Sequence, residues 1–284
     1  MSALIILSVG FAVFAQAEVN QQVTTFVDWK SGALLVTVRR VLPATGPNLP
    51  AAVSEVRTAI ERDSVAIIVE QLRTLPYDSL RTVNELLLEE PHLVGSLVQA
   101  ASGARMTDAR PTPDLRQVEV NFRLDLYGGL LAALIRHDRP VSLNGILGWT
   151  ATTEYTGIVI YAADELTVHG TGNTARLQPA LLPGIYYYTE AGDGVERLME
   201  GGYVDPRHVV QWGPVLYSDD ILDSELSARI GTHPLRIIAY GAFGRYPTDV
   251  VISYHDAVQV LANENNRSLI AEGRVAIIIG SDQL

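Results

Sequence analysis

The side chains best suited to acid–base or metal chemistry lie in the second half of the chain. They are the carboxylates and imidazoles of Asp205, His208, Asp249, His255 and Asp256. Such groups transfer protons or bind a divalent metal when folding brings them within hydrogen-bond distance of one another. One hypothesis is therefore a metal-dependent hydrolase whose site contains Asp205, His208 and nearby carboxylates.

The spacing of these residues favours a structural role instead. Asp205 and His208 are three positions apart, whereas the H-E-x-x-H motif of zinc hydrolases places its two histidines four apart on a helix. Asp205 precedes Pro206, a pair typical of turns, and Asp256 follows Ser253 at the spacing of a helix capping box. We therefore predict no catalytic residue, no metal site and no cofactor, and keep the hydrolase as an alternative.

Nucleotide-binding and serine-hydrolase motifs are missing from the sequence. The glycine-rich segment HGTGN (169–173) matches neither a P-loop nor a dinucleotide fingerprint, and we predict that it closes a hairpin. No G-x-S-x-G sequence is present, so a serine hydrolase of that type has no support.

Aromatic residues of the second half form another candidate site, a contact surface for a protein or a glycan. Its members are Tyr186, Tyr187, Tyr188, Trp212 and Tyr217. Aromatic side chains are enriched at interfaces because they combine a large apolar area with a polar group. Three consecutive tyrosines on a strand must point to both of its faces, so packing in the core and on the sheet is the simpler alternative.

Composition limits the classes of protein to be considered. The chain has 284 residues, 48% of them hydrophobic and 19% charged, which is enough apolar material for a sizeable core. Its formal net charge of -11 argues against nucleic acid as a partner, because such proteins neutralise phosphates with basic surfaces. The absence of cysteine excludes disulfides, thiol nucleophiles and cysteine-ligated metals.

The N-terminal residues predict export. An apolar run from Leu4 to Ala15 is followed by Gln16 and Ala17, which gives the A-x-A pattern of a signal peptidase site. We expect residues 1–17 to be a signal peptide cleaved after Ala17. A positively charged segment before the run is missing, so a buried N-terminal strand or helix is the alternative. No lipid-attachment cysteine follows, and the chain is not expected to carry a lipid anchor of its own.

The elements expected in the first half are helices packed on a small antiparallel sheet. Residues 22–42 alternate in hydrophobicity on both sides of the turn 30–32, which predicts a β-hairpin. Apolar residues at helical spacing begin near Ala51. Residues 117–127 (QVEVNFRLDLY) place every second side chain on an apolar face, which indicates a strand with one solvated side.

Two local signals divide the helical region between these strands. Thr82 and Glu85 have the spacing of a capping box, which predicts a helix N-terminus. Pro91 should end this helix at Glu90 and begin a second short helix, because proline lacks the amide donor that an uninterrupted helix needs. A further short helix is expected over residues 128–137.

The second half is predicted to be a β-rich α+β domain. Strands are expected at 154–162, 203–217, 234–242, 248–254 and 273–279. A helix is expected over 218–231, with Ser218 or Asp219 as its cap and Gly231 as its end, and another over 254–264 with Ser253 as its cap. The predicted fold class of the whole chain is α+β, with domains at 18–136 and 149–284 joined by a linker at 137–148.

A family resemblance rests on YDSLRTVNELL (77–87), SGARM (102–106) and QVEVNFRLDLYGGLLAAL (117–134). This stretch resembles the LPP-twenty lipoprotein family, whose relatives include the amino-terminal domain of the flagellar assembly protein FlgT. Residues 154–279 resemble a C-terminal module found in similar envelope proteins. The resemblance implies a place in the periplasm or at the outer membrane and no catalytic residues; the missing lipobox cysteine departs from the family pattern.

The expected function is therefore that of a non-enzymatic exported protein of the periplasm. The resemblance implies envelope or flagellar proteins as partners and peripheral association with the outer membrane, and it leaves the oligomeric state open. The alternatives are a periplasmic metal-dependent hydrolase and a module that binds an envelope glycan through the aromatic residues above.

Overall fold

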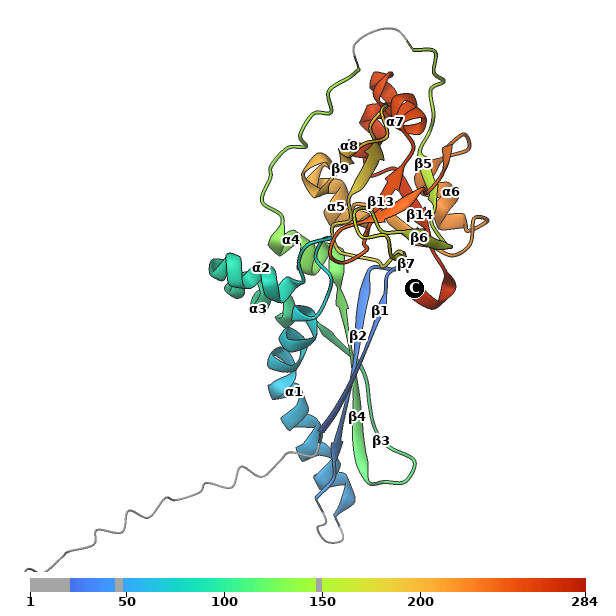
Figure 1. Ribbon diagram of the computed structural model, residues 1–284. Coiled ribbons are helices and arrows are strands. Elements are labelled where there is room, and N and C mark those ends of the chain that lie inside the picture. Colours follow the sequence, from blue (N-terminus) through green and yellow to red (C-terminus); the bar gives the residue numbers. More distant parts are fainter. Residues whose placement is uncertain (1–20, 44–47, 147–149) are drawn as a thin grey trace, which may run out of the picture.

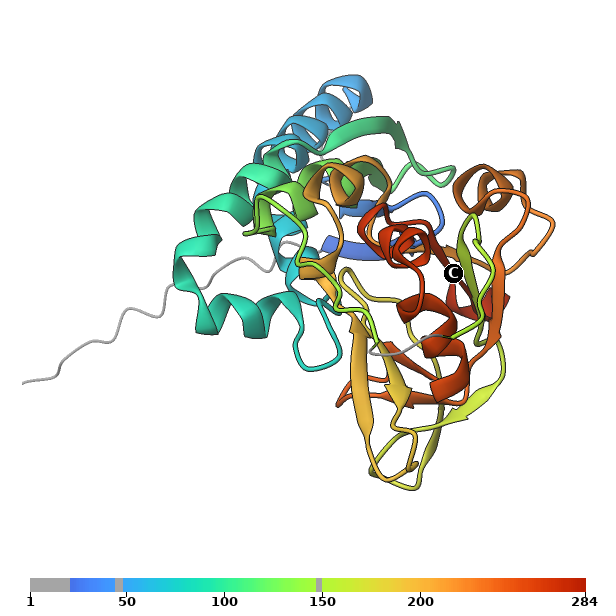
Figure 2. The same cartoon turned by 90° about the horizontal axis from the view of Figure 1, so that it is seen from above.

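The computed structural model describes residues 21–43, 48–146 and 150–284 and arranges them as two domains stacked end to end (Figure 1). The predicted signal peptide and its cleavage site after Ala17 lie outside the described residues. Within the described ranges, no helix has both the length and the apolar character that crossing a bilayer requires. Seen from above, the first helices lie on one side of the molecule and the C-terminal domain lies on the other (Figure 2).

The first domain is an antiparallel sheet with helices packed on one face. Its main elements are β1 (Gln21–Asp28), β2 (Ala33–Val41), α1 (Leu49–Arg73), α2 (Val83–Glu89), α3 (Val94–Ser102), β3 (Arg105–Pro111) and β4 (Gln117–Asp125). The strands lie in the order β1-β2-β4-β3, and each neighbouring pair is antiparallel. The predicted arrangement of this half, helices on a small antiparallel sheet, is confirmed.

Local sequence signals explain where these elements begin and end. β1 and β2 form the predicted hairpin around the turn at 30–32. The Thr82 hydroxyl accepts a hydrogen bond from the Glu85 amide at 3.3 Å, and the Glu85 carboxylate accepts one from the Thr82 amide at 2.8 Å, so the capping box is present. α2 ends at Glu89, and Pro91 opens a 3₁₀ turn that leads into α3.

One face of the sheet supplies the core beneath the helices. The buried side chains of β4 alternate along the strand and are Val118, Val120, Phe122 and Leu124. The opposite face is polar: Arg39 pairs with Glu119 at 2.7 Å, and the Thr37 hydroxyl donates to Asn121 at 2.7 Å. The two-faced pattern read from residues 117–127 therefore corresponds to the two faces of a real strand.

The second domain contains two larger sheets. In the described residues the first sheet has the order β10-β14-β5-β11 and is entirely parallel, whereas the second, β12-β13-β8-β9, is mixed. The strands of the first are β10 (Leu216–Ser218), β14 (Val275–Ile278), β5 (Ile158–Tyr161) and β11 (Leu235–Ile238). Those of the second are β12 (Gly241–Phe243), β13 (Asp249–Ile252), β8 (Ile185–Tyr188) and β9 (Val195–Met199). The central strands β13 and β14 are buried along their whole length.

Short helices and a small hairpin complete this domain. The helices are α5 (Pro206–Trp212), α6 (Ser224–Ile230), α7 (Tyr254–Leu261) and α8 (Glu264–Ala271). β6 (Glu165–Thr167) and β7 (Thr174–Arg176) pair around the glycine-rich segment 169–173, which forms the predicted hairpin loop. The β-rich α+β class predicted for this half is confirmed.

Two predictions of local structure in this domain are wrong. Residues 203–217 are not a strand region, because Asp205 caps α5 and Pro206 occupies its first turn, so only the last residues join β10. The helix predicted from residue 218 begins at Ser224 with Asp223 as its cap, since Ser218 is the last residue of β10. Gly231, at φ 74°, does end that helix as predicted.

Other boundaries differ in detail. The predicted helix at 254–264 is α7, capped by Ser253 as expected, and it is followed by α8, which was not predicted. The short helix expected at 128–137 is a π-helical turn (Leu126–Leu131) that continues into α4 (Ala132–Leu134). These differences leave the predicted class of each domain unchanged.

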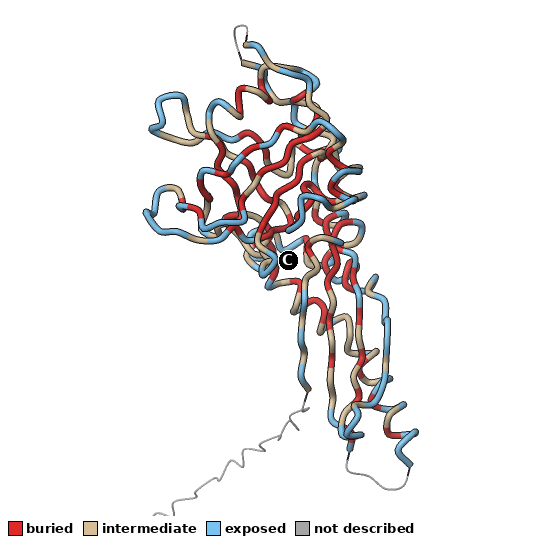
Figure 3. Tube along the Cα trace, turned by 90° about the vertical axis from the view of Figure 1, so that its right-hand side faces the viewer, coloured by how far each residue is buried: buried red, intermediate tan, exposed pale blue. Residues whose placement is uncertain are grey.

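The two domains share a hydrophobic core. Buried residues continue from the sheet of the first domain into the second (Figure 3), and Trp29 meets Tyr217 edge to face at 6.1 Å between ring centroids. Backbone hydrogen bonds also cross the junction, from Leu181 to Pro76 at 3.0 Å and from Leu182 to Tyr77 at 2.8 Å. A shared core and paired backbone groups hold the domains in one relative orientation.

Candidate functional site at the domain junction

Three of the five residues selected for acid–base chemistry make local structural contacts. The Asp205 carboxylate accepts the Arg207 amide at 2.9 Å and pairs with its guanidinium at 2.7 Å, and this hydrogen bonding lowers the pKa of Asp205 to about 2. His208 stacks on Trp212 with ring centroids 5.3 Å apart. Asp256 accepts a hydrogen bond from the Ser253 hydroxyl at 2.6 Å.

These residues also do not converge on one site. Asp205 caps α5 and His208 lies on it, Asp249 begins β13, and His255 and Asp256 lie in the first turn of α7. Within the part of the chain that the structure describes, no group of three or more histidine, aspartate or glutamate side chains is placed to hold a metal ion.

The aromatic residues proposed as a contact surface are separated as well. Tyr217 is 1% exposed and Tyr187 is 9% exposed, so both belong to the core. Tyr186 and Tyr188 are half-buried on the other face of β8. Trp212 lies at the domain junction. These side chains therefore do not form one exposed surface, and Tyr186 and Trp212 line different cavities.

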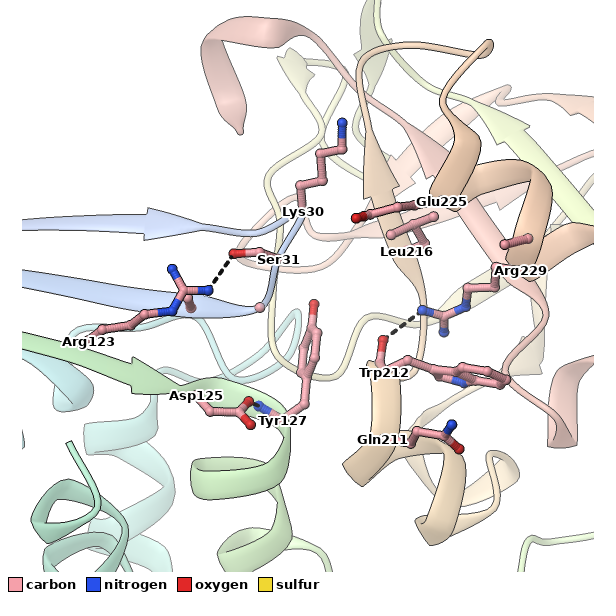
Figure 4. A pocket seen from close by; sticks show the side chains of 13 residues that line it. Lys30, Ser31, Arg123, Asp125, Tyr127, Gln211, Trp212, Leu216, Glu225 and Arg229 are labelled. Carbon is pink, nitrogen blue, oxygen red and sulfur yellow. Dashed lines mark hydrogen bonds between the residues drawn. The ribbon is translucent and has the colours of Figure 1, made fainter. Parts of the chain in front are cut away.

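A cavity of about 560 Å³ lies between the two domains (Figure 4). The first domain lines it with the β1–β2 turn, the end of β4 and Tyr127. The second domain lines it with α5, Leu216 of β10 and α6. Residues nearly 200 positions apart along the chain, such as Lys30 and Arg229, thus meet at one site.

The ring of Tyr127 is held between two glycines, one from each domain. Gly32 has φ +62° and Gly213 has φ +80°, and a Cβ at these positions would lie 2.2 Å and 2.6 Å from the ring. The Tyr127 hydroxyl donates to the Trp29 carbonyl at 3.2 Å, and burial raises the pKa of Tyr127 to about 12. Only glycine both tolerates this backbone and leaves room for the ring.

Arg229 of α6 is a buried cation at the same junction. It is 6% exposed, and its guanidinium donates to the carbonyls of Gly273, Trp212 and Gly213, each at 2.7 Å. The guanidinium also lies over the Trp212 ring, 5.5 Å from its centroid. Burial lowers the pKa of Arg229 to about 10, so the side chain remains protonated at neutral pH.

A second cleft, of about 330 Å³, lies between the domains at another place. Its lining includes Asp249, which is 4% exposed and accepts a hydrogen bond from the Gly184 amide at 2.7 Å. Burial raises the pKa of Asp249 to about 6, although hydrogen bonds from Ser79, Gly184 and Thr248 act in the opposite direction. Ser79 belongs to the first domain, so this carboxyl group is also part of the junction.

Glu85 links helix capping to domain contact. Besides capping α2, its carboxylate pairs with Arg245 at 2.8 Å and accepts a hydrogen bond from the Tyr246 hydroxyl at 3.1 Å. The amide of Thr82 is the largest cause of a pKa lowered to about 2. A carboxylate whose pKa is lower in the folded than in the unfolded state stabilises the folded state at pH values above its unfolded-state pKa. This contribution is lost as the pH falls through the folded-state pKa.

Replacing Glu85 by glutamine should therefore remove part of the acid sensitivity of the fold. We expect the wild-type protein to lose stability as the pH falls from about 4.5 towards 2, and the glutamine variant to lose less, because its side chain is neutral throughout. Urea unfolding at several pH values measures the difference. Glu89→Gln, on the same helix but paired with Arg81 of the same domain, is the matched control. Identical pH profiles of Glu85→Gln and the wild type would contradict the role assigned to Glu85.

Sequence reasoning missed the main residues of the junction. Arg229 was included only as part of the helix predicted over 218–231 and was not among the candidate site residues. Tyr127 was assigned only to the end of a strand. The one available signal was glycine beside aromatic residues, at Gly32 after Trp29-Lys30-Ser31 and at Gly213 directly after Trp212.

The fold and the junction define a two-domain α+β protein whose domains share a core. Residues 20–133 match the family model of Treponema pallidum Tp0624, N-terminal domain, and residues 157–281 match that of Treponema pallidum Tp0624, second domain. The segment that matches the N-terminal domain precedes the segment that matches the second domain. No curated protein matches the chain. Neither family model carries the LPP-twenty or FlgT name, so that finer resemblance stays a prediction.

Proposed function

We propose that this protein is a non-enzymatic, exported component of the bacterial cell envelope that acts as a structural or assembly factor through contacts with other proteins. Its signal peptide is removed after Ala17, and it associates with the outer membrane only peripherally. Envelope proteins, including those of the flagellum, are its partners. Asp205 caps α5, and Asp256 bonds to Ser253, the cap of α7, which supports a structural role over a catalytic one.

The observation that carries this proposal is the outer edge of β11. β11 is the last strand of its sheet. Leu235 donates its amide to the carbonyl of Gly157, just before β5, and Ala239 donates to Tyr161 at the end of β5. Successive amides of a strand point to opposite sides within the sheet, so the amides of Arg236 and Ile238 point away from β5. An added strand would pair with them there. Two apolar side chains are exposed beside this edge, Ile238 at 71% and Tyr240 at 62%.

A hollow next to this edge fits the same role. A cavity of about 450 Å³ is lined mainly by small and apolar side chains that include Tyr161, Leu166 and Ala239. Proteins that keep an apolar strand edge exposed risk aggregation, so such an edge is usually covered by a partner. An extended segment of another protein would pair with β11 and place a side chain in this hollow.

Photo-crosslinking in cells tests the proposal. A photoreactive residue at Ile238 or Tyr240 should form crosslinks to an envelope protein that mass spectrometry identifies, in the same fraction as the mature chain. Leu88, which is 74% exposed on α2, is the matched control position in the other domain. Crosslinks no stronger than those from Leu88 would contradict the assigned surface. A cytoplasmic chain with an uncleaved N-terminus would overturn the proposal as a whole.

A further inference from the structure

We propose that the cavity between the domains, the one lined by Tyr127, Trp212 and Arg229, binds a small organic carboxylate that carries a flat apolar group. This site goes beyond the proposed protein contacts, which use the distant edge of β11. The cavity volume of about 560 Å³ falls within the range of roughly 300–1,000 Å³ typical of small-molecule sites.

The charge of Arg229 is the first argument. Its hydrogen-bond partners are three backbone carbonyls, which orient the guanidinium but carry no net charge. Tyr127 beside it is neutral at neutral pH, because burial raises its pKa to about 12, and no described carboxylate forms an ion pair with Arg229. A buried charge normally has an ionic partner. Two of the five N–H donors of a guanidinium remain after three bonds, which suits a carboxylate.

The surrounding charges are the second argument. The whole chain has a formal net charge of -11, yet the cavity lining has three cationic side chains, Lys30, Arg123 and Arg229, against two carboxylates, Asp125 and Glu225. Asp125 is engaged, since its Oδ1 accepts the amides of Tyr127 at 2.9 Å and Gly128 at 3.1 Å. Lys30 is paired with Asp223 at 2.7 Å, so the cationic side chains of the lining that have no ion pair among the described residues are Arg123 and Arg229.

The walls of the cavity account for the apolar part of the ligand. Figure 4 shows the rings of Tyr127 and Trp212 on two sides of the space into which the Arg229 guanidinium points. Leu216 and Ala228 add apolar surface. Because Arg229 is fixed over the Trp212 ring, a carboxylate paired with it would hold its attached ring between the two aromatic walls.

This chemistry has two sources, a free aromatic acid and the C-terminal carboxylate of a peptide that ends in an aromatic residue. Titration calorimetry with the full chain distinguishes them. One arm uses phenylacetate and its uncharged analogue phenylacetamide. The other uses a short peptide ending in phenylalanine, with a free or an amidated C-terminus. The carboxylate form should bind about tenfold more tightly than the amide in at least one arm, because hydrogen bonds between charged groups are the stronger ones.

Two variants locate the binding. Arg229→Lys keeps the charge but loses the fork that pairs with a carboxylate, and it should weaken binding by about tenfold. Ala228→Phe fills the cavity from an exposed position of α6 outside the core, so it should fold normally and abolish binding. It therefore decides the question even if Arg229→Lys is unstable.

Each remaining outcome would overturn the proposal. Equal affinity for acid and amide in both arms would mean that no carboxylate is recognised. Binding that survives in Ala228→Phe would place the ligand elsewhere. An absence of binding by phenylacetate and by the free-carboxylate peptide, at concentrations of about 10 mM, well above the usual range of specific ligands, would leave the cavity without this role.

Discussion

Replacing Gly213 by alanine is expected to lower the free energy of unfolding by about 3 kcal/mol or more. Two costs combine at this position. The backbone has φ 80° and ψ 166°, a region that residues with a side chain scarcely populate. The new methyl group would also lie 2.6 Å from the Tyr127 ring, which cannot withdraw because Gly32 is packed on it as well.

Two control glycines separate the contributions. Gly192 has φ +73° but open space around it, so Gly192→Ala reports the cost of a positive φ without a steric clash. Gly95 lies in α3 with nothing near it, so Gly95→Ala should be neutral or stabilise by up to about 1 kcal/mol through helix propensity. Urea unfolding measures all three variants. A loss for Gly213→Ala no larger than that for Gly192→Ala would show that the ring does not press on this position.

A double-mutant cycle tests the contact itself. Tyr127→Ala removes the ring and is destabilising alone because it leaves a hole in the junction. In that background Gly213→Ala should cost much less than in the wild type, because only the backbone strain remains. Residues in direct contact characteristically show such non-additive changes. Strict additivity of the two substitutions would contradict the sandwich of Tyr127 between the glycines.

The first domain was predictable because its signals are local. The alternation along residues 117–127 records which side chains face α1, and the pair Thr82 and Glu85 specifies a helix start within four residues. Pro91 likewise acts on its immediate neighbours. Each of these features is determined by residues within one helical turn or one strand. Tertiary contacts therefore changed little of the predicted local structure.

The second domain was harder because its decisive contacts are distant. The apolar pair Val209-Val210 followed by Trp212 resembles a strand, and only the cap at Asp205 with Pro206 behind it favours the observed helix α5. The parallel pairing of β14 with β5 joins segments more than 100 residues apart, and no local pattern encodes it.

The candidate site depends even more on distant contacts. The burial of Arg229 results from Gly273, 44 positions away, and from the end of α5. Its own helix shows only a common amphipathic pattern. The cavity exists because the β1–β2 turn of one domain meets α6 of the other, with Lys30 paired to Asp223 at 2.7 Å. A site made by the contact of two domains has no spacing that a single sequence reveals.

Replacing Asp249 by asparagine is expected to change how stability depends on pH. Burial raises the pKa of this carboxyl group from 3.8 to about 6, which means that the folded protein favours the neutral form. Its contribution to stability is therefore fully present below about pH 4 and is lost as the pH rises through 6. A raised pKa of this size corresponds to about 3 kcal/mol.

The asparagine variant lacks this ionisation but keeps an oxygen that accepts the Gly184 amide. Relative to the wild type, the free energy of unfolding of the variant should therefore rise by about 3 kcal/mol between about pH 4 and pH 8. This change with pH is expected whatever the difference in stability between the two proteins at pH 4. Urea unfolding across this range measures the gain. Asp205→Asn is the control with the opposite sign: the Asp205 pKa is lowered, so that variant should lose stability relative to wild type as the pH rises from about 2 to about 4. Parallel pH profiles for wild type and Asp249→Asn would refute the raised pKa.

The ionisation of Asp249 should also weaken the contact between the domains. The Ser79 hydroxyl bonds to Asp249, the Ser79 carbonyl accepts the Tyr246 amide at 2.9 Å, and Gly244 packs directly on Ser79. A charged, buried Asp249 costs free energy that opening of this contact would relieve by admitting water. We therefore expect the Tyr246 amide to exchange its hydrogen faster above about pH 6, after correction for the intrinsic rate, and Asp249→Asn to abolish that increase. An increase that persists in the variant would assign the opening to another group.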